Sequence, residues 1–313
     1  MAANGTHQPR IDISCLPDVS EPEMDFHDTS FFRSNLHNCP VPQLPTPASI
    51  LEQYPNGGAY VAKFEHLNLA VKFGQSSYLR LEEAQAMRAM RQIFPNNEVP
   101  VPEVFGWRKH GDQTFIYMSL IRGPTLREAW PSLTEADKKA ICGELRCIVA
   151  ALRQITQGSS NRFIGSINGG TLQDCFFKLD YEQGPFWSMK SFNDWLFAAA
   201  TRQRPDPDGV INGLYEDGLY RDLLPDTGNI YFTHGDLTLG NIIISGIPGS
   251  QRIVGIIDWE QAGWYPEYWE YCKLLYGVED SHEWREDGWA DKVMDSYDDE
   301  MDAFANYSSW RCP

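Results

Sequence analysis

Asn241 and Asp258 stand at the two ends of a predicted β-hairpin, where an amide oxygen and a carboxylate could share one metal ion. Two short apolar runs, 242–245 and 252–257, flank the turn Gly246-Ile247-Pro248-Gly249 and predict this hairpin. Opposed residues of an antiparallel pair have Cα atoms about 4.5–5.5 Å apart, so the open end would bring Asn241 and Asp258 together. Because Mg²⁺ takes oxygen ligands, the pattern predicts a magnesium site.

Asp236 lies five residues before Asn241, in the loop that enters the hairpin. Its carboxylate could therefore face the metal site without belonging to it. A carboxylate in that position can orient an attacking hydroxyl and accept its proton, which is general-base chemistry. His234 is expected to be structural and to hold the loop by hydrogen bonds to the backbone.

The residues that precede this loop predict a small sheet. Apolar residues at every second position from Leu67 to Phe73 indicate a half-buried strand, and a partner strand is expected at 59–65. Ala70 and Lys72 would then share the face opposite the apolar row. Two further strands are predicted from the segments VFGW and TFIYMSL, which flank a turn at His110-Gly111-Asp112.

Helical patterns fill most of the remaining chain. Apolar residues at helical spacing predict a helix over 81–94, with Ser76 and Ser77 available as caps. The segment Thr134-Glu135-Ala136-Asp137 resembles a capping box and predicts a long helix that continues to Ile155.

Three motifs carry a resemblance to a known family. HGDLTLGN at 234–241 resembles the catalytic loop of the aminoglycoside phosphotransferase and choline kinase superfamily, which has the form H-G-D-x-x-x-x-N. IIDWE at 256–260 resembles the metal-binding motif of that family, and AGWYPEYWEY at 262–271 is similar to its fungal phosphotransferase members. The resemblance covers roughly residues 48–313.

The resemblance implies an α+β, protein kinase-like bilobal fold with ATP between the lobes. Residues 48–122 would form a small β-rich N-lobe that binds the nucleotide. Residues 123–313 would form a larger, mainly helical C-lobe with the catalytic loop, the metal site and the acceptor site. Residues 1–47 are rich in Pro, Asn, Ser and Asp without periodicity, and they predict an irregular N-terminal arm.

The resemblance also assigns residues to the nucleotide. Lys72 in LAVK would hold the α- and β-phosphates of ATP, and Glu83 on the following helix would pair with Lys72. Ala70 would line the adenine pocket. Met118 and Leu120 would belong to the hinge beside the adenine.

For the reaction itself, the resemblance makes Asp236 the catalytic base and makes Asn241 and Asp258 the Mg²⁺ ligands. The implied activity is that of an ATP- and Mg²⁺-dependent phosphotransferase, a small-molecule kinase. It would move the γ-phosphate of ATP to a hydroxyl of a small molecule.

Two alternatives stay open. The chain has no G-x-G-x-x-G, only Gly57-Gly58, which leaves a catalytically weak pseudokinase that binds nucleotide or acts as a scaffold. A protein kinase is the other alternative. However, Gly235 replaces the arginine that protein kinases use to read a phosphorylated activation loop. Pro266 also follows Asp258 by only eight positions, which leaves little room for such a loop.

Composition excludes several classes of partner. A net charge of −17 argues against nucleic acid and against an anionic membrane surface. No apolar run reaches the length of a membrane span. The seven cysteines are never spaced as C-x-x-C, which is typical of reduced thiols in a cytoplasmic protein. No segment indicates a protein partner.

Acidic residues are concentrated after the catalytic loop. Residues 258–302 contain fifteen Asp or Glu and three Lys or Arg, a net charge of −12. A cleft bordered by one sign of charge attracts ligands of the other sign, so we expect a neutral or cationic acceptor. The alternative is a solvated helix face that only keeps the protein soluble.

Overall fold

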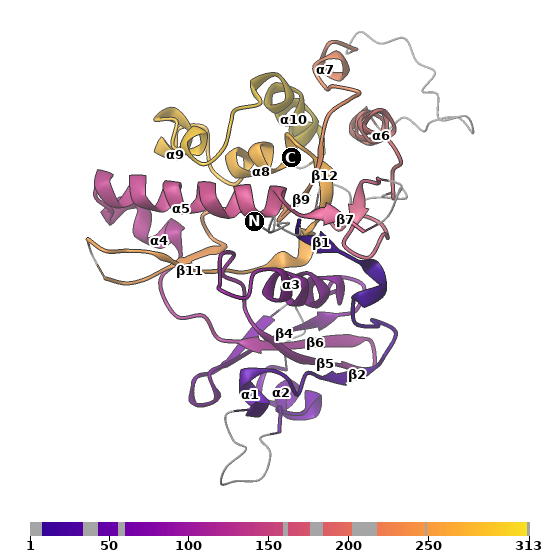
Figure 1. Cartoon of the computed structure of the whole chain (residues 1–313), viewed down its shortest axis with the longest axis vertical. Helices are drawn as coiled ribbons and strands as arrows, with labels where there is room; N and C mark the ends of the chain where they lie inside the picture. The colour runs from indigo at the N-terminus through magenta and orange to yellow at the C-terminus, as the bar shows by residue number, and fades with distance from the viewer. Residues whose placement is uncertain are drawn as a thin grey trace, which may run out of the picture.

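The computed structural model describes residues 8–33, 43–55, 60–158, 162–175, 184–201, 218–247 and 249–311. A β-rich part and a mainly helical part lie on either side of a narrow connection (Figure 1). The α+β class predicted from the sequence is confirmed by this arrangement. The pair Gly57-Gly58 lies outside the described residues.

A five-stranded antiparallel sheet forms the β-rich part, with the strand order β2-β5-β6-β4-β3. Strands β4 and β6 pair along their full length, so Lys72 stands opposite Ile116 and Ala70 opposite Met118. This pairing places the predicted phosphate residue and the predicted hinge on adjacent strands. The strands are β2 (Glu23–Asp25), β3 (Tyr60–Phe64), β4 (Leu69–Gln75), β5 (Val104–His110) and β6 (Gln113–Ser119).

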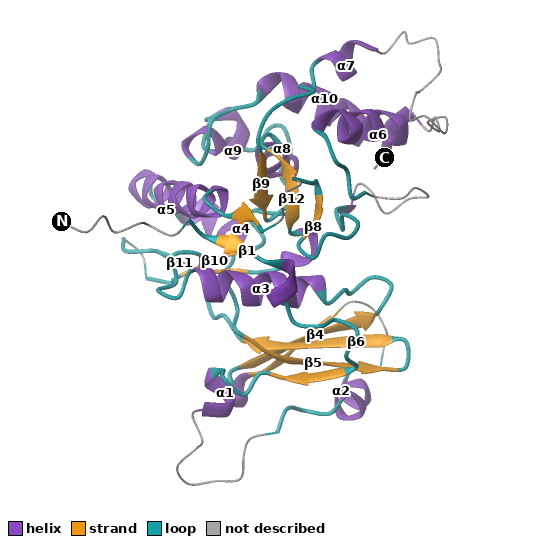
Figure 2. Ribbon diagram, turned by 45° about the vertical axis from the view of Figure 1, so that its right-hand side comes forward, coloured by secondary structure: helices purple, strands orange, loops and turns teal. Residues whose placement is uncertain are grey.

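Helices cover both faces of the sheet. Helix α3 (Glu82–Ile93) lies on one face, while α1 (Ser30–Arg33) and α2 (Pro47–Gln53) lie on the other (Figure 2). The alternate residues Leu69, Val71 and Phe73 enter the apolar core under α1 and α2. Ala70 belongs to the larger core on the other face, as the period-2 pattern predicts.

Helix α3 begins later than its predicted caps. Its N-cap is Leu81, which makes no side-chain capping bond. The Ser76 hydroxyl bonds to that of Thr114 at 2.8 Å instead, because strand β4 continues to Gln75 and a turn precedes the helix. The cap prediction for Ser76 and Ser77 is therefore wrong, although the predicted apolar face of α3 is buried.

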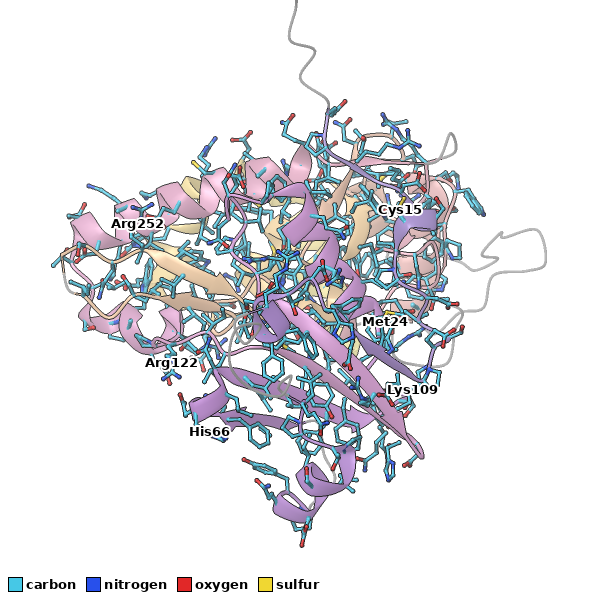
Figure 3. All side chains as sticks on the ribbon, turned by 60° about the horizontal axis from the view of Figure 1, so that its bottom comes forward. Cys15, Met24, His66, Lys109, Arg122 and Arg252 are labelled. Atoms are coloured by element: carbon cyan, nitrogen blue, oxygen red, sulfur yellow. The ribbon has the colours of Figure 1, made fainter. Side chains whose placement is uncertain are left out.

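The N-terminal arm is not irregular in the residues that the structure describes, which corrects the prediction for 1–47. Strand β1 (Arg10–Ile11) pairs in parallel with β7 (Thr156–Gln157) of the helical part, and η1 (Ile13–Cys15) follows. Strand β2 then pairs with β5 at the edge of the sheet, where Figure 3 labels Met24 and Lys109. Unpaired backbone groups of an edge strand accept an added strand, and this explains why a segment without apolar periodicity is ordered.

The helical part is built around the long helix α5 (Glu135–Arg153). Thr134 caps it by accepting a hydrogen bond from the Asp137 backbone N–H, which confirms the predicted start. A three-stranded sheet, β8-β12-β9, lies beside α5 and α8 (Figure 1). The helical part also contains the following elements, the three strands of this sheet among them: α4 (Leu126–Ala129), η3 (Trp130–Ser132), β8 (Gly165–Ser166), α6 (Met189–Thr201), α7 (Gly218–Asp222), β9 (Ile230–Thr233), β12 (Gly263–Pro266), α8 (Trp269–Tyr276), α9 (Glu283–Glu286), η6 (Ala290–Lys292) and α10 (Asp298–Arg311).

The predicted hairpin is present. Strands β10 (Ile242–Ile244) and β11 (Ile253–Ile256) pair antiparallel, with Ile242 opposite Ile256. The Ile257 N–H donates to the Asn241 carbonyl at 2.9 Å, which extends the pairing to the open end. The backbones of Asn241 and Asp258 are therefore brought together at that end.

Within the described part of the chain, no helix combines the length and the apolar character needed to cross a bilayer. Five of the cysteines lie in that part, and all five are free thiols.

Candidate active site

Lys72 is the centre of a cluster of charged side chains. Its ammonium contacts Glu83 Oε2 at 2.8 Å, Asp258 Oδ1 at 2.6 Å and Glu260 Oε2 at 3.1 Å. Glu83 comes from α3, while Asp258 and Glu260 follow the hairpin, so the cluster joins the β-rich and helical parts. The partner on α3 is Glu83 rather than its neighbour Glu82, which pairs with Arg80.

The cluster carries more negative than positive charge. Burial lowers the pKa of Lys72, but the three carboxylates outweigh this effect and the net shift is upward, so the ammonium stays charged. Burial raises the pKa of Glu83 to about 7 against the opposing effect of Lys72. The side chains of Asp258 and Glu260 are 37% and 28% exposed, so their surplus charge faces an accessible space.

Asp258 has an unusual backbone. Its φ of 66° lies in the left-handed region, which non-glycine residues seldom adopt. The residue is the N-cap of η5 (Trp259–Gln261), yet its side chain makes no capping bond there. The carboxylate reaches Lys72 instead, so a capping role does not account for this residue.

Asp236 and Asn241 are joined directly. The Asn241 amide nitrogen donates to the Asp236 backbone carbonyl and to its Oδ2, both at 2.8 Å. This leaves Asp236 Oδ1 and the Asn241 carbonyl oxygen to face other groups. Burial raises the pKa of Asp236 to about 6, while Lys273 acts in the opposite direction.

The His234 side chain holds the catalytic loop (residues 234–241) by hydrogen bonds to the backbone. Its Nδ1 accepts from the Asp236 N–H at 3.2 Å, so Nε2 carries the proton and donates to the Ile257 carbonyl at 3.1 Å. Burial lowers the pKa of His234 to about 4, which keeps the ring neutral. Gly235 has a φ of 76°, and a Cβ there would lie 2.7 Å from the Gln261 carbonyl. A side chain at position 235 is therefore excluded by both conformation and space.

A cleft of about 370 Å³ lies beside the cluster. Its wall contains all five of the residues expected to bind the nucleotide, together with Asp258. The five are Ala70, Lys72, Glu83, Met118 and Leu120.

Sequence reasoning missed several residues that line this cleft. Val61 on β3 is 52% exposed although it is apolar, and Ile243 and Ile257 come from the hairpin. The predicted pairing of the two strands was a usable signal, since Val61 stands opposite Lys72 and opposed side chains share one face of a sheet. Ile243 and Ile257 lie within apolar runs of the sequence, and such runs are typical of a buried core rather than of a ligand-binding surface.

The oxygen-rich donor set fits a divalent cation. Oxygens of Glu83, Asp258 and Glu260 lie within 4.8 Å of one another, around the Lys72 ammonium. Asn241 stands at the same end of the hairpin, where its backbone carbonyl accepts from the Ile257 N–H. Carboxylate and amide oxygens are the ligands that Mg²⁺ prefers. Asn241 and Asp258 stay the predicted ligands, and Glu260, whose role the sequence left open between metal, acceptor and surface, stands beside Asp258 in this cluster.

Comparisons with known proteins bear on the family and on the fold. The model of the phosphotransferase enzyme family matches residues 53–307. The chain is similar to the solved structure of aminoglycoside 2′-phosphotransferase-IIIa in its GDP complex, with 14% identity, a TM-score of 0.52, and 83% of this chain and 87% of that one covered. It is also similar to aminoglycoside phosphotransferase APH(3″)-Id from Streptomyces rimosus, with 16% identity, a TM-score of 0.48, and 84% and 96% covered. No curated protein matches the chain significantly. The family and the predicted kinase-like bilobal fold are confirmed.

Proposed function

The chain belongs to the phosphotransferase enzyme family, and we propose that it is an ATP- and Mg²⁺-dependent kinase of a small-molecule hydroxyl. The observation that carries this proposal is the contact of Lys72 with both Glu83 and Asp258 in the wall of the cleft. Phosphoryl transfer depends on positioning and on charge neutralisation, and this cluster supplies both.

The nucleotide would occupy the 370 Å³ cleft. Apolar side chains from both parts of the molecule would enclose the base, among them Ala70, Val61 and Ile243. Lys72, held by Glu83, would bind the phosphates as a fixed point charge. The GDP complex of aminoglycoside 2′-phosphotransferase-IIIa makes GTP the alternative donor to test.

Asn241, Asp258 and Glu260 would hold Mg²⁺. When bound, the ion would neutralise charge on the phosphates, which is the chemistry that metals supply in phosphoryl transfer. The surplus of carboxylates over Lys72 supports this assignment, since a cluster of three acids and one lysine gains from an added cation.

Asp236 would orient the acceptor and receive its proton. Asn241 holds Oδ2 of Asp236, so Oδ1 would accept the hydrogen bond of the attacking hydroxyl. His234 and Asn241 fix the loop on both sides of Asp236, which limits the motion of this carboxylate.

A small acceptor is favoured over a protein by the chain that follows Asp258. The segment η5 leads at once into β12, which pairs with both β8 and β9. The residues that would form an activation loop are therefore committed to a short helix and a sheet.

The expectation of a cationic acceptor has less support than the acidic segment 258–302 suggested. Glu283 pairs with Lys138, Asp295 with Arg146, and Asp280 with Arg285. Lys138 and Arg146 lie outside the segment and offset two of its charges, whereas Arg285 is already included in the net charge of −12. A cationic acceptor would still show kcat/KM that falls as ionic strength rises, and an anionic preferred acceptor would contradict the expectation.

A thermal-shift measurement combined with an ATP-consumption screen tests the proposed function. Mg-ATP or Mg-GTP should raise the Tm, and at least one hydroxyl compound of a metabolite library should stimulate nucleotide consumption. Stabilisation by nucleotide without turnover on any acceptor would favour the pseudokinase. Label transferred from ATP to proteins of a lysate would favour a protein kinase.

A further inference from the structure

Lys273, on α8, lies outside the predicted site and is almost completely buried, with 1% of its side chain exposed. Its ammonium contacts Asp174 Oδ1 at 3.1 Å and Gln261 Oε1 at 3.0 Å. Asp174 is fully buried and also accepts from Trp269 Nε1 at 3.0 Å. A buried ion pair is costly to desolvate, so stability alone is a weak reason for its presence.

The contacts of Lys273 lead to the metal-binding loop, which we define as residues 258–262. Gln261 closes η5, three residues after Asp258, and its side-chain oxygen accepts from both Lys273 and the Cys175 N–H. The Gln261 backbone lies against Gly235 so closely that a Cβ on Gly235 would be 2.7 Å from the Gln261 carbonyl. Gln261 therefore touches the catalytic loop and is held by Lys273.

The same helix also holds the catalytic loop directly. Glu270 lies one turn before Lys273 on α8, and its Oε2 accepts from the His234 N–H at 2.7 Å. Residues three apart share one face of a helix. One face of α8 thus presents a buried acid to the catalytic loop and a buried lysine to the metal-binding loop.

We infer that Lys273 is a positioning residue that, through Asp174 and Gln261, sets the metal-binding loop relative to the catalytic loop. The inference rests on the proposed function for its catalytic consequence. Misplacement of catalytic groups by about 1 Å can cost about 10²-fold in rate, so a buried group can matter without touching substrate.

A double variant separates positioning from stability. Lys273→Met combined with Asp174→Asn removes both charges, leaves no unpaired buried ion, and keeps an acceptor for Trp269. We expect its Tm to recover most of the loss caused by Lys273→Met alone. Hydrogen exchange should still accelerate in 234–241 and 258–262 and stay unchanged elsewhere. The kcat for Mg-ATP turnover should fall about 10–100-fold, with the KM for Mg-ATP within about threefold of wild type.

Lys138→Met is the matched control. Lys138 is also a well-buried lysine of the helical part, with 11% of its side chain exposed and an ion pair to Glu283. The Lys138→Met variant should have a lower Tm than wild type. Its hydrogen exchange in 234–241 and 258–262 and its kcat should be unchanged. Wild-type exchange and kcat in the double variant would overturn the inference, because the pair would then be only stabilising. If the wild-type protein consumes no nucleotide with any acceptor, the proposed function fails, and the exchange rates still decide the role of Lys273.

Discussion

Two buried lysines organise two regions of this molecule, and their surroundings differ. Lys72 stands on a strand among three carboxylates, two of which are more than a quarter exposed. Lys273 stands on a helix, and its described ionic partner Asp174 is sealed from solvent. The first region has surplus negative charge beside a cleft, whereas the second is balanced and closed.

This difference separates a region suited to bind ligands from one suited to hold loops. Surplus charge that faces an accessible space can be neutralised by a cation or a phosphate-bound metal. A balanced pair without solvent access offers nothing to a ligand, and its effect must act through the groups that it touches. Burial of a lysine alone therefore does not identify a binding site.

Asp236→Asn should have the largest effect, because under the proposed function Asp236 acts at the reacting atoms rather than in either lysine region. General-base removal typically lowers turnover by about 10²–10⁴-fold. Affinity for Mg-ATP should stay nearly unchanged, since Asp236 is not among the residues that line the cleft and an Asn side chain keeps an oxygen that can accept from Asn241. Steady-state kinetics with isothermal titration of Mg-ATP measures both. A fall in kcat of less than about tenfold would remove the base assignment.

Lys72→Met should lower kcat/KM for Mg-ATP by about 10²-fold through lost phosphate positioning. It also tests the comparison of the two lysines. Mg²⁺ should raise the Tm of Lys72→Met more than that of wild type, because the ion replaces the missing positive charge among exposed carboxylates. Lys273→Met should show no such rescue, since Asp174 is inaccessible. If Mg²⁺ raised the Tm of both variants by the same amount, the Lys72 region would not differ from the Lys273 region in its ability to bind a cation.

Asp258→Ala should abolish the preference for Mg-ATP over metal-free ATP. Even removal of a residue that only supports a metal ligand typically costs about 10–100-fold in metal affinity, and a ligand should cost at least as much. Titrations of ATP with Mg²⁺ and with EDTA measure the preference. A variant that still binds Mg-ATP much more tightly than free ATP would show that Asp258 is not the anchor.

The smallest effect is expected from the titration of Glu270, and it concerns the stability of the fold rather than turnover. Burial raises its pKa to about 7, while the unfolded chain would ionise it near the ordinary value of 4.5. Between these values the folded state keeps a proton that the unfolded state releases, so stability should fall as pH rises from about 4.5 to about 7. The expected loss is about 1–3 kcal/mol. Chemical denaturation at several pH values should show a flatter profile for Glu270→Gln, and an unchanged slope would contradict this prediction.

Local patterns were sufficient to predict the hairpin at the candidate site. Asn241 and Asp258 are brought together by a hairpin whose strands and turn lie within a short stretch of chain. The faces of β4 follow from the alternation of its side chains, so Lys72 could be placed opposite the apolar row. In these cases backbone hydrogen bonds between near neighbours impose the geometry, and the sequence records it directly.

Only the tertiary structure decided the contacts between distant segments. Asp174 and Lys273 are separated by 99 positions, and no local period relates them. The sequence left the role of Glu260 open between the metal or acceptor and the surface, and the β-rich part brings the Lys72 ammonium to within 3.1 Å of its Oε2. Residues 23–25 of the N-terminal arm form a strand because they pair with the edge of β5 rather than because of their own pattern. Such pairings depend on where whole elements pack, because the free energy that favours them arises from burial and pairing across the fold.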